Sequence, residues 1–214
     1  MFYLGCEGLI IKALYKNSSY QPGQRNFNWL KLKKDYLETS IGDSLDLVPI
    51  AADYGKGYIQ HKNRKRTGTF GSFLLACYND ETECYETLTK TATGLKDEDL
   101  KRFYEIMKEY IIQSPRNDYV KGDVSVDVWF EPKLVWEIKT ADLSLSPIYT
   151  AAINEGEEKR GISLRFPRFI RERPDKLPHE CTTSKEVYQM YTNQAFNNKN
   201  KKEIEIDNED EFYD

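Results

Sequence analysis

The sequence predicts a mainly β fold of the α+β class, and three observations support this prediction. Alternating or apolar runs of strand length recur between residues 45 and 171. One amphipathic helix is expected between the third and fourth of these strands. Clusters of Lys and Arg give the folded part a basic surface. About five strands, one intervening helix and a basic surface are typical of the partly open barrel called the OB-fold, which commonly binds nucleic acid. A mixed α+β domain without a ligand is the alternative.

The expected elements follow one another along the chain. A helix is expected from Asp97 to about Ile112, because its acidic first turn complements the helix dipole and its apolar residues recur on one face. A last helix is expected to start near Thr183, with Ser184 or Thr183 as its cap, and to cover Glu186–Phe196. The expected strands are Leu9–Tyr15, Trp29–Asp35, Leu45–Asp53, Phe70–Tyr78, Glu83–Thr91, Asp127–Phe130, Leu134–Thr140 and Ile162–Arg171.

The sequence predicts three parts in the chain. Residues 1–37 contain only two short strands, which cannot build a core, so this part should belong to a larger sheet or pack on the main domain. Residues 38–196 form the main domain, and residues 38–43 are expected to be a hinge. Residues 197–214 form an acidic tail with seven Asp and Glu residues, and we expect it to be disordered.

Composition excludes several classes of protein. A chain of 214 residues with 39% hydrophobic residues can bury a core and is not globally disordered. No apolar run approaches the roughly 20 residues of a membrane span, and the start lacks the basic segment of a signal peptide. We therefore expect a soluble, intracellular protein without a membrane partner. The four cysteines form no CxxC pair and accompany only two histidines, which argues against a zinc site.

The most basic stretch runs from Arg160 to Lys176 and contains six cationic and two acidic side chains. This basic run begins as an alternating strand, and Pro167 is expected to limit it to an edge strand or a bulge. Arginines on an edge strand suit a phosphate backbone, because the guanidinium group offers a planar fork of donors. The alternative is that the charges only prevent aggregation at an exposed edge.

Three further patterns combine charge with strands or loops. Glu7 begins an apolar strand and Lys12 ends it, which suits a divalent metal and a phosphate respectively. Lys31 and Lys33 lie on one face of a strand, where they repel each other unless an anion lies between them. Charged strand ends and solvated surfaces are the alternatives. A glycine-bearing loop over residues 56–66 suits a phosphate backbone or is simply solvated. Its cations include Lys56, Arg64 and Arg66.

Five runs together resemble a known family. They are CEGLIIKAL, NWLKLKKDYL, TGTFGSFLLACY, WEIKTADLSLSPIY and GISLRFPRFIRERPDK. They closely resemble the carboxy-terminal part of ATP-dependent DNA ligases of the eukaryotic DNA ligase I type, over residues 5–196. The resemblance implies an OB-fold barrel preceded by the last strands of a nucleotidyltransferase (adenylation) domain. It also implies a nuclear enzyme that seals nicks in duplex DNA in replication, repair and recombination, with ATP and Mg²⁺ as cofactors.

The resemblance implies roles for residues in the first part of the chain. EGLIIK resembles motif IV of the family, which makes Glu7 a metal-binding carboxylate beside the adenylate and Lys12 a supporting cation. LKLK resembles motif V, which places Lys31 and Lys33 on the AMP phosphate.

The basic run resembles two functional parts of the family. Its end resembles motif VI, whose charged residues, here Arg173, Asp175 and Lys176, orient the ATP pyrophosphate during adenylation. Arg165 and Phe166 match positions in the minor groove beside the nick, where an apolar wedge distorts the duplex. Further DNA contacts are expected at Arg168, Lys56, Arg64 and Arg66.

One family motif is missing from the sequence. The nucleophilic lysine of the family lies in a KxDG motif, and no lysine here is followed by x-Asp-Gly. We therefore expect that this chain alone cannot form lysyl-AMP. The expected partners are nicked double-stranded DNA and the amino-terminal part of the ligase, with a sliding clamp as a further candidate. A non-catalytic OB-fold module that binds DNA is the main alternative. An mRNA capping enzyme is a third, against which ADLSLSPIY argues.

Overall fold

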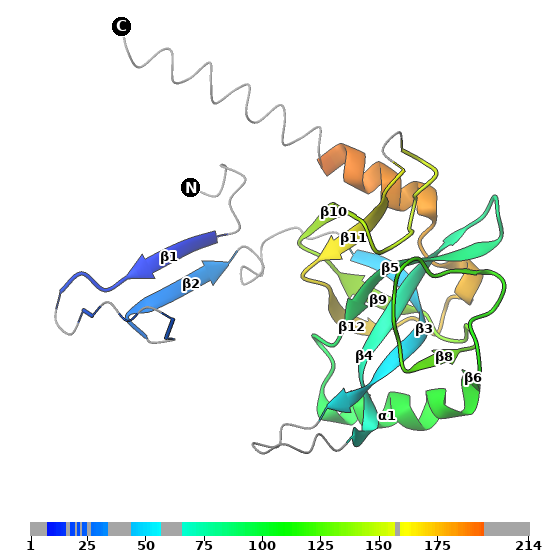
Figure 1. Cartoon of the computed structure of the whole chain (residues 1–214), viewed down its shortest axis with the longest axis horizontal. Helices are drawn as coiled ribbons and strands as arrows, with labels where there is room; N and C mark the ends of the chain where they lie inside the picture. Colours follow the sequence, from blue (N-terminus) through cyan, green and yellow to red (C-terminus); the bar gives the residue numbers. More distant parts are fainter. Residues whose placement is uncertain are drawn as a thin grey trace, which may run out of the picture. The chain divides into compact units, whose positions relative to one another are not determined.

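The computed structural model describes residues 8–15, 18–19, 21, 23–24, 27–33, 44–56, 66–156 and 159–194. They belong to two units, one that includes Met1–Ile41 and one that comprises Gly42–Gln194 (Figure 1). The predicted boundary after residue 37, the hinge at 38–43 and the acidic tail lie outside the described residues and stay predictions. Within the described part, no helix has the length and apolar character needed to cross a membrane.

The first unit contains an antiparallel hairpin of β1 (Gly8–Lys12) and β2 (Trp29–Lys33). Both predicted strands are present. Strand β1 ends earlier than expected, whereas the expected end of the second strand lies outside the described residues. Ile11 and Leu30 lie opposite each other and are 53% and 50% exposed. This exposure agrees with the expectation that two short strands do not bury a core of their own.

The second unit is built on one curled sheet (Figure 1). Its central strand is β3 (Ser44–Lys56). One edge of β3 pairs first with β9 (Trp136–Lys139) and then with β8 (Val128–Phe130), and the other edge pairs with β4 (Arg66–Asn79). Pro49, which has no N–H to donate, lies between the β9-paired and β8-paired segments. The strands are β3 (Ser44–Lys56), β4 (Arg66–Asn79), β5 (Cys84–Thr91), β6 (Ile111–Ile112), β7 (Tyr119–Val120), β8 (Val128–Phe130), β9 (Trp136–Lys139) and β12 (Arg168–Glu172).

An aromatic core fills the inside of this sheet, and helix α1 (Asp97–Met107) lies across one end of the strands (Figure 1). The ring centroid of Phe103 on α1 lies 4.4 Å from that of Trp136, and the Trp136 centroid lies 5.2 Å from that of Phe169. All three side chains are buried. The curled, mainly β arrangement with a helix after β5 confirms the predicted OB-type fold.

Helix α1 ends earlier than the sequence predicts. It ends at Met107, a 3-10 turn η2 follows over Lys108–Tyr110, and Ile111–Ile112 form β6. The prediction of a helix to Ile112 was wrong because β6 pairs with β8. Branched Ile side chains fit a paired strand well, so tertiary pairing outweighs the helical pattern.

The strand predicted over residues 162–171 is in fact two strands. Strand β11 (Gly161–Arg165) pairs with β10 (Asp142–Ser146), which the sequence did not predict, and β12 pairs with β9. The chain changes partner at Phe166 and Pro167. Strand β12 lies at the end of the strand order and carries a register shift. The expectation of an edge strand at Pro167 is therefore confirmed, whereas the single strand was wrong.

A helix covers residues 184–194 and begins where the sequence predicts. Its N-terminus is capped reciprocally, because the Glu186 N–H donates to Thr183 Oγ1 at 3.2 Å and the Thr183 N–H donates to Glu186 Oε2 at 2.7 Å. Of the two predicted caps, Ser184 and Thr183, Thr183 is therefore the one that makes these capping bonds.

Candidate functional site

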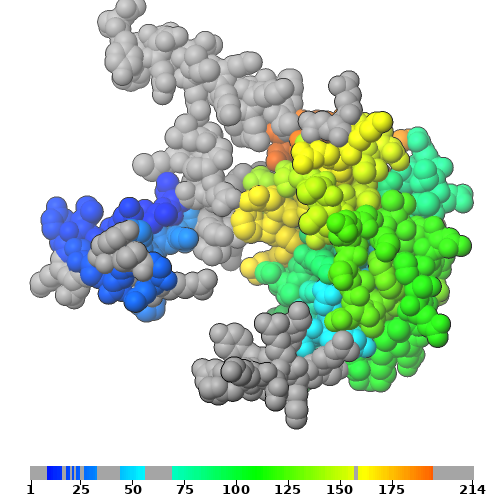
Figure 2. Space-filling view, viewed as in Figure 1, coloured from blue at the N-terminus to red at the C-terminus, as the bar shows by residue number. Residues whose placement is uncertain are grey.

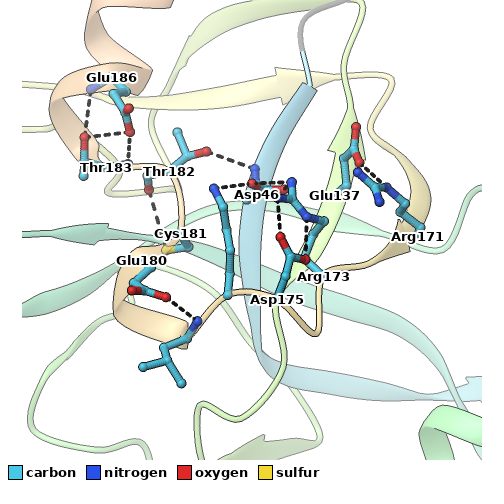
Figure 3. A network of polar contacts seen from close by, with 12 residues as sticks. Asp46, Glu137, Arg171, Arg173, Asp175, Glu180, Cys181, Thr182, Thr183 and Glu186 are labelled. Carbon is cyan, nitrogen blue, oxygen red and sulfur yellow. Dashed lines mark hydrogen bonds and ion pairs between the residues drawn. The ribbon is translucent and has the colours of Figure 1, made fainter.

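Asp46 on β3 lies at the centre of a network of charged groups (Figure 3). Arg173 Nη1 donates to Asp46 Oδ1 and Oδ2 at 3.0 and 2.9 Å, and Lys176 Nζ lies 2.7 Å from Oδ2. Arg173 Nε and Nη2 donate to the two oxygens of Asp175 at 3.0 and 2.8 Å. These four residues, called the Asp46 network below, contain two carboxylates and two cations. Their formal charges therefore balance.

Main-chain hydrogen bonds hold the Asp46 network in place. The Asp46 N–H donates to Thr182 Oγ1 at 2.9 Å, and the Thr182 N–H donates to the Asp46 carbonyl at 2.8 Å. After β12 ends, the Arg173 N–H donates to the Val135 carbonyl at 2.7 Å. Asp46 is only 8% exposed. A carboxylate at that depth needs cationic partners, which Arg173 and Lys176 provide.

The network leaves its members unequally available to a ligand. The contact with Arg173 lowers the pKa of Asp175 to about 2, and the contact with Asp175 raises the pKa of Arg173. The Arg173 side chain is 19% exposed and all three of its nitrogens donate to carboxylates, whereas Lys176 and Asp175 are 34% and 59% exposed. Lys176 and Asp175 therefore present charge to solvent, while Asp46 holds the Lys176 ammonium group and Arg173 holds the Asp175 carboxylate.

Other charged residues of the basic run, of both signs, are also paired with residues of opposite charge. Arg171 Nε lies 2.7 Å from Glu137 Oε2, and Arg102 Nη1 on α1 lies 2.7 Å from Glu172 Oε2. Glu137 comes from β9, the neighbour of β12. Acidic residues from other strands therefore offset part of the positive charge that the run shows in the sequence.

Residues 165–168 form the turn between β11 and β12, called the Phe166 turn below. Phe166 has a positive φ of 55° and is 39% exposed, and the guanidinium carbon of Arg165 lies 5.4 Å from the centroid of its ring. Arg168 on the other side of Pro167 is exposed as well. Figure 2 shows the yellow segment that contains β11 at the surface of this unit. The turn brings the predicted DNA-contacting residues Arg165, Phe166 and Arg168 together.

The hairpin of the first unit places its predicted phosphate-binding residues on one face. In the β1–β2 register Lys12 lies opposite Trp29, Ile10 opposite Lys31 and Gly8 opposite Lys33. Directly opposite residues share a face, so all three lysine positions lie on the same side of the hairpin. Lys12 Nζ lies 4.6 Å from the centroid of the Trp29 ring, and Lys31 is exposed. The structure does not describe the Lys33 side chain.

The remaining predicted residues lie at the limits of what the structure describes. Lys56 and Arg66 pair at the ends of β3 and β4, but their side chains are not described, and Arg64 and Glu7 lie outside the described residues. Within the described ranges, no group of three or more His, Cys, Asp or Glu side chains could hold a metal ion. The metal site at Glu7 stays a prediction.

Sequence analysis missed Asp46 and Thr182. A signal for Asp46 exists, because strand alternation puts this carboxylate on the same face as Val48 and Ile50, which are fully buried. A charge on a buried apolar face requires a partner of opposite sign. For Thr182 the local sequence carries no comparable signal.

Comparison with known proteins identifies the family. Residues 66–176 match the family model described as "ATP dependent DNA ligase C terminal region", a stretch that includes the Phe166 turn, Arg173 and Lys176. DNA ligase 1 of Dictyostelium discoideum is 49% identical over 209 residues, which cover 97% of this chain and 17% of the relative. DNA ligase 1 of Drosophila melanogaster is 48% identical, covering 97% and 27%. A probable DNA ligase of Persephonella marina is 45% identical, covering 89% and 31%.

Among solved structures, the ligase domain from M. tuberculosis LigD aligns with 77% of this chain and 44% of its own length, at 20% identity and a TM-score of 0.46. The chain spans less than a third of the length of the three curated relatives named above. The family model nevertheless matches more than half of the chain. The chain therefore belongs to the ATP-dependent DNA ligase family and contains its C-terminal region.

Proposed function

We propose that this chain acts in a nick-sealing DNA ligase and supplies two contact surfaces to the reaction. The Phe166 turn contacts the nicked duplex, and Asp175 and Lys176 face the ATP pyrophosphate. The family match over residues 66–176 carries this proposal, because it includes both sites. Strand β12, which has five residues and spans roughly 15 Å, leads from the Phe166 turn toward Asp175 and Lys176. This separation supports two distinct duties.

The chemistry of the Phe166 turn suits a nick in duplex DNA. Arg165 and Arg168 provide guanidinium groups, which bind phosphate oxygens in a planar fork. Phe166 is partly exposed between them, and an apolar ring of this kind can enter a base step where the backbone is broken. Cations at Lys56, Arg64 and Arg66 would extend the contact along the phosphate backbone.

Phosphate-binding residues are proposed in each of the two units. We propose that Lys12, Lys31 and Lys33 bind the adenylate phosphate on the lysine face of the hairpin. Mg²⁺ held at Glu7 would neutralise charge at phosphorus during transfer. Lys176 would bind the pyrophosphate, since an ammonium group that is one-third exposed can reach a phosphate oxygen.

The chain is proposed to need a second part of the ligase. No lysine lies in a KxDG motif, so the nucleophile for lysyl-AMP formation must come from elsewhere. The amino-terminal part of the ligase is the expected source. A sliding clamp and a nuclear location also stay predictions, and the relatives include a bacterial protein as well as eukaryotic ones.

Two measurements on the 214-residue chain test these proposals. Fluorescence anisotropy with a nicked duplex and with an intact duplex of the same sequence should show tighter binding to the nicked one. Incubation with radiolabelled ATP and Mg²⁺ should give no covalent label. Equal affinity for both duplexes would favour the non-catalytic DNA-binding module. Covalent label on the chain would show that it contains a nucleophile after all.

A further inference from the structure

Phe166 adopts a backbone conformation that its own sequence context disfavours. Its φ of 55° lies in the left-handed region, which bulky side chains rarely occupy. The residue before a proline is moreover driven toward extended conformations, and Pro167 follows directly. Such a conformation persists only where the surrounding structure imposes it. The contacts around Phe166 show what imposes it.

The carbonyl groups on both sides of Phe166 are held by hydrogen bonds. On the β11 side, the Ala141 N–H donates to the Arg165 carbonyl at 3.1 Å. On the β12 side, Thr91 Oγ1 at the end of β5 donates to the Pro167 carbonyl at 3.0 Å. Thr140 Oγ1 also donates to the Arg165 carbonyl at 3.0 Å. The Arg165 carbonyl therefore has a main-chain donor as well as a side-chain donor, whereas the Thr91 side chain donates to the Pro167 carbonyl. The hold on the Pro167 carbonyl therefore depends on the identity of residue 91.

The end of β5 is built to keep Thr91 in this position. The Thr93 N–H donates to Thr91 Oγ1 at 3.3 Å, and the Phe169 N–H donates to the Thr93 carbonyl at 2.9 Å. Gly94 has a φ of 93°, and a Cβ there would lie 2.3 Å from the Phe169 carbonyl oxygen, so only glycine permits this approach. Thr91 is 3% exposed, which leaves little access for water to replace its hydroxyl.

We propose that Thr91 is a positioning residue for the DNA contact of Phe166. Its hydroxyl holds the Pro167 carbonyl and thereby keeps Phe166 in the left-handed conformation that presents the ring to the nick. This inference rests on the proposed function of the Phe166 turn. It assigns to β5 a part in nick recognition through a hydrogen bond rather than through contact with DNA.

The structural half of the inference can be tested without DNA. In the 214-residue chain, NMR measures the φ of Phe166 through its Cα chemical shift and its HN–Hα coupling. Thr91→Val removes the hydroxyl while keeping the shape, and it should abolish or average the positive-φ signature. Thr89→Val is the matched control, because Thr89 is also 3% exposed on β5 but donates to the Lys90 carbonyl at 3.4 Å. An unchanged signature in Thr91→Val overturns the inference.

The functional half requires a double-mutant cycle with Phe166→Ala. We expect Thr91→Val to lower the preference for nicked over intact duplex by about threefold to tenfold, the value of one hydrogen bond. It should have no further effect when Phe166 is already Ala, because Thr91 acts through that ring. The fluorescence of 2-aminopurine beside the nick should fall back toward its stacked value in both single variants.

The outcomes separate the two proposals. If Phe166→Ala leaves the nick preference unchanged, the proposed DNA contact is wrong and the positioning role is wrong with it. If Phe166→Ala lowers the preference, only the role of Thr91 is wrong in two cases. In the first, Thr91→Val does not lower the preference; in the second, it lowers the preference by the same factor with and without Phe166→Ala. Should Thr91→Val fail to fold, Thr91→Ser and Thr91→Ala differ only in the hydroxyl. The Ser variant should keep the φ signature and the nick preference, and the Ala variant should lose both.

Discussion

Glu86 on β5 is a buried carboxylate that joins three separate segments of the second unit. Asn79 Nδ2 donates to its Oε1 at 2.9 Å, while Ser184 Oγ and the Ala152 N–H donate to Oε2 at 2.7 and 2.8 Å. Glu86 is 2% exposed. Ser184 begins the helix at residues 184–194, so Glu86 ties this helix to the sheet. We predict that Glu86→Gln destabilises the second unit and loosens the start of the helix.

The magnitude can be derived from the three hydrogen bonds. Gln keeps the shape and one carbonyl oxygen of Glu86, but its NH₂ group must face one of the three donors. Flipping Asn79 would not help, because its Oδ1 already accepts from the Glu81 and Thr82 N–H groups at 3.0 and 3.1 Å. An unsatisfied buried donor costs about 1–3 kcal/mol, and loss of a charged acceptor adds about 1 kcal/mol. We expect a loss of about 2–4 kcal/mol, and a Tm lower by roughly 5–15 °C for a unit of this size.

Thermal unfolding followed by circular dichroism measures this effect, and hydrogen exchange of the amides in residues 184–194 shows where it acts. Glu83→Gln is the matched control, because Glu83 lies in the same hairpin but is exposed. Its Tm should stay close to the wild-type value. If Glu86→Gln melts together with Glu83→Gln, Glu86 is not the anchor that its hydrogen bonds indicate.

Three further predictions concern the basic run. Arg173 lowers the pKa of Asp175 from 3.8 to about 2. The pair therefore stabilises the fold at neutral pH, and its contribution to stability is lost as the pH falls from about 4 through 2. An NMR titration of the Asp175 carboxyl carbon should show a midpoint near pH 2, and Arg173→Gln should return that midpoint toward 3.8. In a ligase that carries this chain, Phe166→Ala should lower the rate of nick sealing about tenfold more than it lowers ATP labelling. Lys176→Ala should instead lower ATP labelling more than nick sealing. If both variants impair the same step, the proposed division between DNA contact and ATP contact is wrong. Asp46→Asn should reduce ATP labelling as Lys176→Ala does, because Lys176 loses its anchor, while binding to nicked DNA stays unchanged; weaker DNA binding would argue against this assignment.

Local patterns were sufficient to predict much of the fold. The β4–β5 hairpin, the start of α1 and the cap at Thr183 depend on residues close together in the sequence, and each lies where it was predicted. The end of α1 was mispredicted because its outcome depends on β8, which lies well beyond the helix in the sequence. Propensity decides such a boundary only where no distant strand competes for the same residues.

The break at Phe166 shows where local information ends. Proline at position 167 indicated a disturbed strand, but the change of partner from β10 to β9 depends on where those two strands lie in the fold. Phe166 has a positive φ, and the carbonyl groups on either side of it accept hydrogen bonds from Thr140, Ala141 and Thr91, which are distant in the sequence. The sequence could therefore predict that this position is unusual, but not the conformation that makes it a candidate contact for DNA.

Charge in the basic run shows the same limit in electrostatic terms. The six cations predicted an unusual charged region, but the carboxylates that pair with three of them, Arg171, Arg173 and Lys176, come from other strands. Asp46 lies 127 residues before Arg173, and Glu137 lies 34 residues before Arg171. Because these acids occupy Arg173 and Arg171, the field presented by the run is not the sum of its charges. Near Asp46 the charge is balanced, and position rather than excess charge governs what Lys176 can bind. A polyphosphate with several oxygens in a defined arrangement suits such a site better than a uniform phosphate backbone does. This argument supports the proposal that ATP binds at this end of the run and DNA at the Phe166 turn.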